Sequence, residues 1–362
     1  MIEEKSRHMF PGGNTPLGFY SYYDYIIDKT TANRLFILKG GPGTGKSTLM
    51  KKIGYELASK GYDIEFMHCS SDNDSLDGIV APKLSFAIID GTSPHITDPV
   101  YPGVVDEIVN LGQFWDQKGL MKHRDDIIIA SKRKKASFER AYRYLKAASF
   151  LLDDTEKIYK DALDKGAKLA FTHEIKELLF GNKKPSKVPG KQRRLFASAI
   201  TPKGYVNYLD SLCVNHSIIR LSAQAGMNTG HIMEILNDEA LYKGFNTETY
   251  YCPMVPDKIE HVVIPDLKLS IITANEYYDI TDINIDNCKT YNMEQFYKDE
   301  TIQYYSDQLK FNRLYADTII QKAVESIALA KSYHTQMEKY YIKNMDFKGL
   351  SELKDILMQR IM

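Results

Sequence analysis

Two stretches of this chain share one outline. LFILKGGPGTGKSTLMKKIG occupies residues 35–54, and IIRLSAQAGMNTGHIMEILN occupies residues 218–237. A shift of 183 residues places Arg34–Thr92 over Ser217–Asn275 without a gap and gives 14 identities in 59 positions. Shifts of 186 upstream and 182 downstream align further segments, including TPLGFYSYYDYI with TPKGYVNYLDSL. A shift that stays nearly constant over both halves indicates a tandem duplication, which requires a fold of two similar units.

The first copy contains a glycine-rich loop between an apolar run and a helical pattern. RLFILK, before the loop, is typical of a buried strand, and apolar residues after it recur at helical spacing. Glycines let the backbone wrap a phosphate, and a helix N-terminus adds partial positive charge. The loop matches GxxxxGK followed by Ser or Thr, which predicts a phosphate site rather than a chance glycine turn. The predicted ATP-binding residues are Gly41, Pro42, Gly43, Thr44, Gly45, Lys46, Ser47 and Thr48.

The third predicted strand of this copy, KLSFAIIDG, ends at Asp90. A carboxylate there is typical of the Walker B position, which holds Mg²⁺ through water; the alternative is an ordinary aspartate at a strand end. We predict Ser47 and Asp90 as magnesium ligands and Lys46 and Asp90 as catalytic residues. Only one strand separates the loop from Asp90, an order closer to kinases and GTPases than to RecA-like proteins.

Two absences narrow the chemistry. No NKxD motif supports guanine specificity, and Gly91 rather than glutamate follows Asp90, so the water-activating carboxylate of many ATPases is missing there. Four further positions have two interpretations. They could supply a catalytic base from elsewhere in the chain, or they could be solvated loop residues: Asp72, Asp74, Asp77 and His95.

The second copy has lost the phosphate-binding residues. Under the shift of 183, the replacements are Gly40 by Ala223, Gly45 by Asn228, Lys46 by Thr229, Ser47 by Gly230 and Asp90 by Thr273. The strand and helix patterns remain. We therefore predict that the second half keeps the fold as a pseudo-NTPase and does not bind Mg–nucleotide in the usual way; support of another anion by Gly230 or His231 is the alternative.

A long amphipathic helical stretch follows each copy, at about residues 117–180 and 293–362. The predicted fold is α/β: two tandem P-loop NTPase-like, three-layer α/β/α domains with mainly parallel sheets, each followed by an antiparallel helical hairpin. The expected boundaries are 1–182 for the active domain, 183–193 for a basic linker and 194–362 for the degenerate domain. The halves are expected to form an intramolecular pseudo-dimer.

Composition excludes several classes of partner. Lys plus Arg and Asp plus Glu both total 47, and the basic runs are more typical of solvated faces than of nucleic-acid sites. No apolar run approaches the ~18 residues of a membrane span. Four cysteines without metal-site spacing favour buried thiols in a reducing cytoplasm.

Three arginines, one in the N-terminal segment and two at the start of the second half, invite a functional interpretation. Arg7, or Arg193 and Arg194 from the other half, could approach a γ-phosphate as an arginine finger. Surface arginines without such a role are the alternative.

The phrases FPGGNTPLGFYSYYDYI, GGPGTGKST, IIDGTSPH and FASAITPKG give the chain a resemblance over nearly its whole length. It resembles the P-loop NTPase superfamily, and within it a bacterial family of tandem P-loop proteins. The resemblance implies binding of ATP and Mg²⁺ through Lys46, Ser47, Thr48 and Asp90, and it implies no particular substrate.

Three functions remain open at this point. The first is an ATPase that acts through the first repeat, with the second as scaffold or regulator. The second is a small-molecule or nucleotide kinase, and the third is a non-catalytic, nucleotide-gated interaction module. Each leaves an acceptor or protein partner to be identified.

Overall fold

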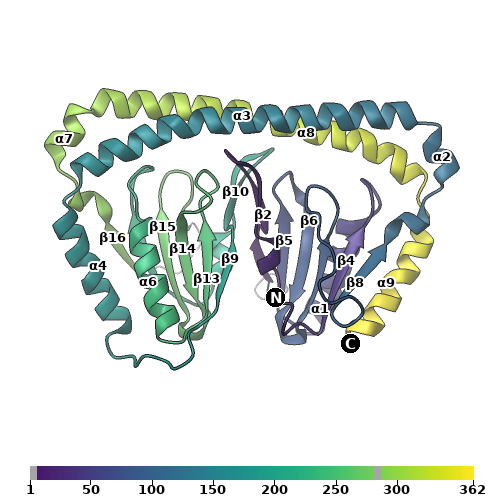
Figure 1. Ribbon diagram of the computed structural model, residues 1–362, viewed down its shortest axis with the longest axis horizontal. Coiled ribbons are helices and arrows are strands. Elements are labelled where there is room, and N and C mark those ends of the chain that lie inside the picture. Colours follow the sequence, from purple (N-terminus) through teal and green to yellow (C-terminus); the bar gives the residue numbers. More distant parts are fainter. Residues whose placement is uncertain (1–5, 281–286) are drawn as a thin grey trace.

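The computed structural model describes residues 6–280 and 287–362. Two α/β units stand side by side, and a pair of long helices crosses both of them (Figure 1). Within those ranges, none of the helices combines the length and the apolar character that a bilayer crossing requires.

The first unit is a six-stranded mixed sheet. Its strands, in sheet order, are β1 (Ser6–Met9), β5 (Ile64–Cys69), β6 (Asp72–Ala81), β7 (Phe86–Asp90), β4 (Arg34–Lys39) and β8 (Asp106–Asn110). Only β6 runs against its neighbours; β1 is parallel to β5, and β4 is parallel to both β7 and β8. Both β5 and β6 lie between the glycine loop and Asp90 in the chain, so the single intervening strand expected from the sequence is wrong. Helix α1 (Lys46–Ser59) follows β4, and a hairpin of β2 (Gly12–Thr15) and β3 (Gly18–Ser21) precedes it.

The second unit repeats this topology strand by strand. Its sheet order is β9 (Gln192–Leu195), β13 (Thr247–Tyr251), β14 (Ile259–Ile264), β15 (Leu269–Ala274), β12 (Ser217–Ser222) and β16 (Cys288–Asn292). Helix α6 (Gly230–Tyr242) corresponds to α1, and β10 (Ser198–Thr201) pairs with β11 (Gly204–Asn207) as β2 pairs with β3. The α/β class is therefore confirmed, with two mostly parallel six-stranded sheets.

Alternate residues of each central strand face different cores, because successive side chains of a strand point to opposite faces. In β4, Phe36 and Leu38 pack with α1 and with α9 (Phe347–Ile361). Leu35 and Ile37 belong instead to a core that contains strands of both sheets, the turn η2 (Tyr23–Tyr25) and α5 (Leu209–Leu212). This second face packs on the other unit, not on a further layer of long helices, so the predicted three-layer arrangement is wrong on that face.

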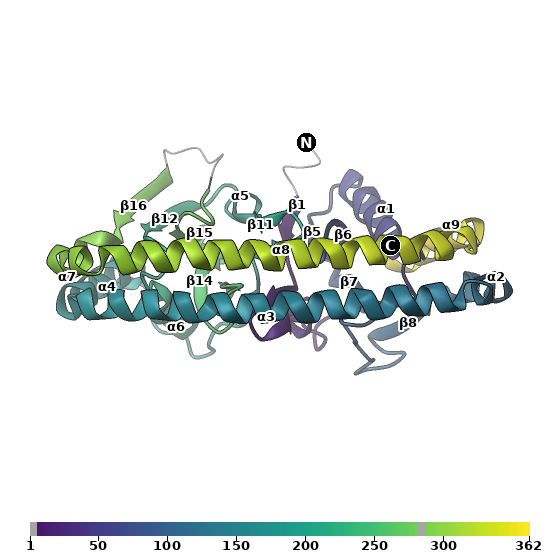
Figure 2. The same cartoon turned by 90° about the horizontal axis from the view of Figure 1, so that it is seen from above.

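The long helices are shared between the units. They are α2 (Gln117–Met121), α3 (Arg124–Ala162), α4 (Lys165–Phe180), α7 (Asp299–Tyr304), α8 (Ser306–Lys343) and α9. Figure 2 shows α3 and α8 running alongside each other over both sheets. At about 1.5 Å per residue, the 39 residues of α3 reach roughly 58 Å, which carries the chain from one unit to the other.

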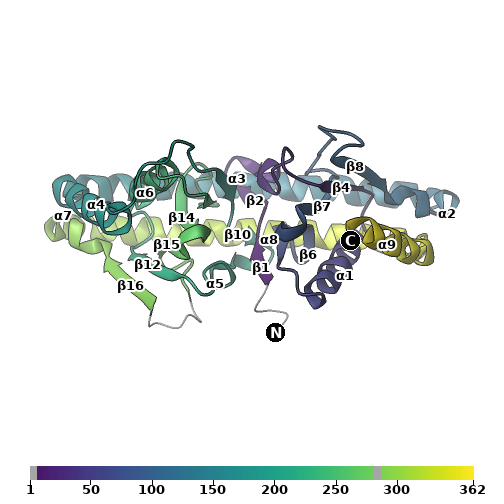
Figure 3. The same ribbon diagram turned by 90° about the horizontal axis from the view of Figure 1, so that it is seen from below.

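The two helical hairpins predicted for the separate halves are therefore wrong. The main partner of α3 is α8, and the helices that follow them exchange places: α4 packs on α6 of the second unit, and α9 packs on α1 of the first. Seen from below, α4 and α9 lie at opposite ends of the molecule (Figure 3). Helical periodicity predicted the helices, but their apolar faces fit either unit, and the length of α3 and α8 decides the choice.

Candidate functional site

The glycine loop lies between β4 and α1, in the ranges that the sequence predicted for a strand and a helix. Gly43 and Gly45 have φ values of 66° and 82°, a region that residues with a Cβ rarely adopt. A Cβ at Gly45 would come within 2.7 Å of the Leu350 side chain, and one at Gly40 within 2.9 Å of the Thr44 hydroxyl. The loop therefore needs glycine both for its backbone shape and for its tight packing.

The structure brings Lys46 and Asp90 together beneath this loop. Lys46, the first residue of α1, donates from Nζ to the carbonyl oxygens of Gly40 and Gly41 at 2.7 and 2.9 Å. Its Nζ lies 3.6 Å from Oδ2 of Asp90. Asp90 ends β7, the parallel neighbour of β4, and accepts hydrogen bonds from the backbone and side chain of Thr92. A cation and a carboxylate thus meet at the carboxyl ends of two adjacent parallel strands.

The predicted residues around Lys46 have different surroundings. The Ser47 hydroxyl accepts a hydrogen bond from the backbone N–H of Leu76 in β6 at 3.0 Å, which leaves it a second lone pair. The buried Thr44 hydroxyl donates to the Gly41 carbonyl at 2.9 Å and closes the turn. Thr48 faces a recess between α1 and α9. The loop thus offers one hydroxyl beside the lysine.

The C-terminal end of α8 covers the mouth of the loop. A Cβ at Gly43 would meet the backbone of Glu338, and one at Gly41 would meet the ring of Tyr341. The Gly43 backbone N–H, an amide that a bound phosphate would use, also interacts electrostatically with the Glu338 carboxylate. Burial and the nearby charge of Asp72 raise the pKa of Glu338. Sequence reasoning missed these residues because they lie about 300 positions along the chain from the loop.

Further cationic groups approach the loop from the paired helices. Burial lowers the pKa of Lys134 on α3, and the positive charge of Lys46 lowers it further. Burial also lowers the pKa of His334 on α8 to about 4, with added repulsion from Lys134 and Lys46. Lys331, one turn before His334, pairs with Asp72 at 2.6 Å. With a pKa near 4, His334 is uncharged at pH 7, so the repulsion between Lys134 and Lys46 is what indicates a place where an anion would be stabilised.

The four positions considered as catalytic bases separate into two groups. Asp74 is exposed and pairs with Lys203, as expected of a solvated loop residue, and Asp72 pairs with Lys331 near the loop. Asp77 and His95 are instead buried, with exposed fractions of 3% and 7%. For these two, the solvated-loop interpretation is wrong.

The arginine-finger hypothesis is wrong for Arg7 and Arg193. Both guanidinium groups contact Glu65 on β5 and Glu248 on β13 at the boundary between the units. Arg7 and Arg193 correspond under the shift of 186, and Glu65 and Glu248 under the shift of 183, so the quartet is a product of the duplication. Arg194 lies over the ring of Tyr25.

The second loop has the same position but a neutral interior. The hydroxyls of Thr229 and Thr273, at the positions of Lys46 and Asp90, form a buried hydrogen bond of 2.6 Å. Asn228 accepts from the Gly230 backbone N–H at 2.8 Å and donates to Glu156 of α3 at 2.7 Å. Lys168 of α4 donates to the Asn228 carbonyl oxygen. Other protein groups thus already form hydrogen bonds with the donors and acceptors of the second loop.

The helix residues around the two loops also differ in charge, with more basic side chains around the first loop. Under the shift of 182, the counterparts of Lys134, Lys331 and His334 are Ala316, Ser149 and Leu152. Glu338 and Tyr341 keep their identities as Glu156 and Tyr159, which lie beside the second loop. The cations that surround the first loop are therefore absent at the corresponding helix positions.

The comparisons with known proteins reach only part of this architecture. Fold and site define a two-unit α/β protein with one charged and one neutral glycine loop. Residues 21–85 match the family model described as Nephrocystin 3, N-terminal, a stretch that contains the glycine loop, α1, β5 and β6. No curated protein matches the chain, and no solved structure does.

Proposed function

We propose that the first unit binds Mg–ATP and hydrolyses it. The observation that carries this proposal is the Lys46–Asp90 pair beneath a loop whose glycines adopt positive φ. Backbone amides of the loop and the N-terminus of α1 would hold the phosphates, Lys46 would contact the β- and γ-phosphates, and Ser47 with Asp90 would hold the metal. Mg²⁺, when bound, neutralises charge that develops on the phosphate oxygens.

Lys134 takes the place of an arginine finger in this proposal, with His334 beside it as a neutral hydrogen-bond donor. Both come from the α3–α8 pair and both are electrostatically coupled to Lys46. An anionic γ-phosphate would relieve the repulsion among these groups and would draw α3 and α8 towards the loop. The same groups are missing around the second loop, which supports a role in phosphate chemistry over a role in folding.

A nucleotide-gated switch is the second candidate, and the Glu338–Gly43 contact favours it. A phosphate that occupies the Gly43 amide would compete with the Glu338 carboxylate for it, at a place where the backbone of Glu338 packs on Gly43, so binding would move the end of α8. Because α8 spans both units, that movement would be transmitted to the second unit. Here the second unit acts as a pseudo-NTPase scaffold whose position reports the state of the first.

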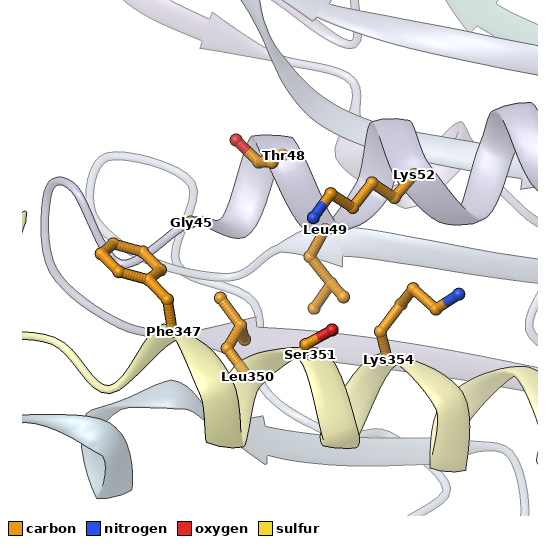
Figure 4. Close-up of a pocket in the computed structure, with 8 residues that line it drawn as sticks. All are labelled: Gly45, Thr48, Leu49, Lys52, Phe347, Leu350, Ser351 and Lys354. Atoms are coloured by element: carbon orange, nitrogen blue, oxygen red, sulfur yellow. The ribbon is translucent and has the colours of Figure 1, made fainter.

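The recess beside the loop is the proposed place of the nucleobase. Gly45, Thr48 and Leu49 form one wall, and Phe347 and Leu350 of α9 form the other (Figure 4). A flat ring is suited to stack on the half-exposed Phe347.

The four thiols are free, in keeping with a reducing, cytoplasmic compartment.

The test separates hydrolysis, phosphotransfer and binding without turnover. The full chain is incubated with γ-labelled ATP and Mg²⁺, with and without a metabolite pool. Release of inorganic phosphate without an acceptor supports the ATPase, label on a metabolite supports the kinase, and binding without turnover leaves the switch. Absence of ATP binding by calorimetry would overturn all three.

A further inference from the structure

A cluster of donor groups, of which two are buried and one is partly exposed, lies in the first unit, outside the glycine loop. It consists of Cys69 at the end of β5, Asp77 in β6 and His95 in the segment after β7. One donor atom from each lies within 4.8 Å of the others, and His95 Nε2 is 3.6 Å from Asp77 Oδ1. The three residues are separated by eight and eighteen positions in the sequence, so no short metal-binding motif announces them.

Several polar atoms around this cluster have no partner. Among the described residues, Asp77 Oδ2 and His95 Nδ1 make no hydrogen bond, nor does the Tyr23 hydroxyl. A buried polar group without a partner loses its solvation and gains no hydrogen bond in return. Tyr23 stacks on His95 with ring centroids 4.8 Å apart, which fixes the imidazole in place. Such a concentration of orphaned donors and acceptors points to a ligand that binds among them.

In the second unit, other residues occupy two of the three positions of this cluster. Cys252, Glu260 and Tyr278 correspond to Cys69, Asp77 and His95 under the shift of 183. There the Tyr278 hydroxyl donates to Glu260 Oε1, although Glu260 Oε2 is left without a partner. A hydrogen bond from the phenol thus connects Tyr278 to Glu260, two of the three residues in the second unit. In the first unit, an imidazole stands 3.6 Å from the carboxylate, too far for a hydrogen bond.

We propose that Cys69, Asp77 and His95 bind one divalent transition-metal ion, with Zn²⁺ as the best fit. Thiolate, imidazole and carboxylate are the three ligand types that zinc takes in proteins, and a thiolate disfavours Mg²⁺ and Ca²⁺. Metal–ligand distances of about 2.0–2.1 Å place the N and O ligands of a tetrahedral site about 3.3 Å apart, close to the distance observed. Three protein ligands leave a fourth position for solvent.

This ion would join three segments next to the proposed nucleotide site. The end of β5, the middle of β6 and the segment that follows Asp90 all contribute a ligand. That last segment also contains Thr92, whose side chain and backbone N–H contact Asp90. The metal is therefore expected to position the Asp90 loop, and the inference does not depend on nucleotide binding.

Cobalt spectroscopy on the untagged, full-length chain tests the proposal. After removal of bound metal with a chelator, Co²⁺ is titrated in, and a thiolate-to-cobalt charge-transfer band is followed. We expect a band that saturates at about one equivalent, in line with a single three-ligand site. Cys69→Ser should abolish the band, whereas Cys252→Ser, the matched change in the second unit, should leave it intact.

Asp77→Asn gives a second variant in case Cys69→Ser does not fold, and it should weaken cobalt binding while keeping the side-chain shape. Elemental analysis of the protein as purified should find zinc in wild type and in Cys252→Ser. The wild-type titration decides the matter without any variant. No charge-transfer band in wild type, or an equal band in Cys69→Ser, would overturn the proposal and would indicate that water fills the cluster.

Discussion

The first and second glycine loops share a fold position and differ in charge. The first holds Lys46 against Asp90 and lies near Lys134 and His334; the second holds two threonine hydroxyls bonded to each other. Partly buried charges are expensive and do not by themselves stabilise a fold. The second unit, with the same topology, shows that two neutral threonines can complete the positions of Lys46 and Asp90, although Glu156 and Lys168 contact that loop. The charges of the first loop are thus better explained by a ligand than by folding.

The first prediction tests the comparison at its centre, since we expect a complete loss of nucleotide binding there. Lys46→Ala should remove nucleotide-dependent stabilisation, which at ligand concentrations 100-fold above Kd amounts to about 2.7 kcal/mol. Thr229→Ala, the matched change in the second loop, should keep it. Thermal unfolding with and without Mg–ATP measures both. Equal losses would mean that the second loop also binds the nucleotide.

The second prediction concerns the helix cations. Lys134→Met should lower the rate of phosphate release by about 100-fold, since the loss of one group that stabilises developing charge commonly costs that much. ATP affinity should change little, and the unliganded chain should become slightly more stable because a cation that Lys46 repels is removed.

Lys132→Met, an exposed change on the same helix, is the control for Lys134→Met. Steady-state phosphate release and titration calorimetry separate turnover from binding. A normal rate in Lys134→Met would remove this lysine from the proposed chemistry.

The third prediction concerns the ionic quartet, where the units remain alike. Arg193→Met leaves Glu65 and Glu248 without part of their compensation and should cost about 3 kcal/mol of unfolding free energy. ATP binding by the folded protein should remain, because Arg193 lies away from the loop at the boundary between the units. Urea unfolding and calorimetry test the two halves of this statement. A selective loss of turnover with normal stability would restore the arginine-finger hypothesis.

These elements show how much of the structure could be predicted from the sequence. The duplication predicted two like units, and local periodicity predicted β4, α1 and their counterparts, because both depend on neighbouring residues. The exchange of α4 and α9 was missed, since an amphipathic face does not specify which sheet it covers. Lys134, His334 and Glu338 were missed for a related reason: they reach the loop only through the antiparallel pairing of α3 and α8, a contact between distant segments.

The fourth prediction uses a histidine found only in the second copy. His261 is fully buried, accepts a hydrogen bond from the Thr273 backbone N–H, and corresponds to Gly78 in the first unit. Burial lowers its pKa from 6.5 to about 3. The folded state therefore binds fewer protons than the unfolded state between these values, and the stabilisation present above pH 6.5 is lost as pH falls.

From pH 6.5 to pH 5, this histidine should reduce the unfolding free energy by about 2 kcal/mol. His261→Gln, which keeps an acceptor for Thr273, should show a smaller loss over the same interval. Urea unfolding at the two pH values gives the difference directly. An unchanged pH dependence in the variant would show that His261 does not titrate as a buried group.

The smallest expected effect sharpens the comparison at the neutral loop. Thr229→Val leaves the buried Thr273 hydroxyl without its partner and should cost about 1–2 kcal/mol, because an unsatisfied buried group loses its solvation without return. The double change Thr229→Val with Thr273→Val removes both hydroxyls and keeps their shape, so it should cost less than the single change. Chemical denaturation of the three proteins measures this order. If the double variant were the least stable, the two hydroxyls would stabilise the second loop by more than their mutual hydrogen bond. The contrast between a first loop that binds a ligand and a second loop that only keeps the fold would then be wrong.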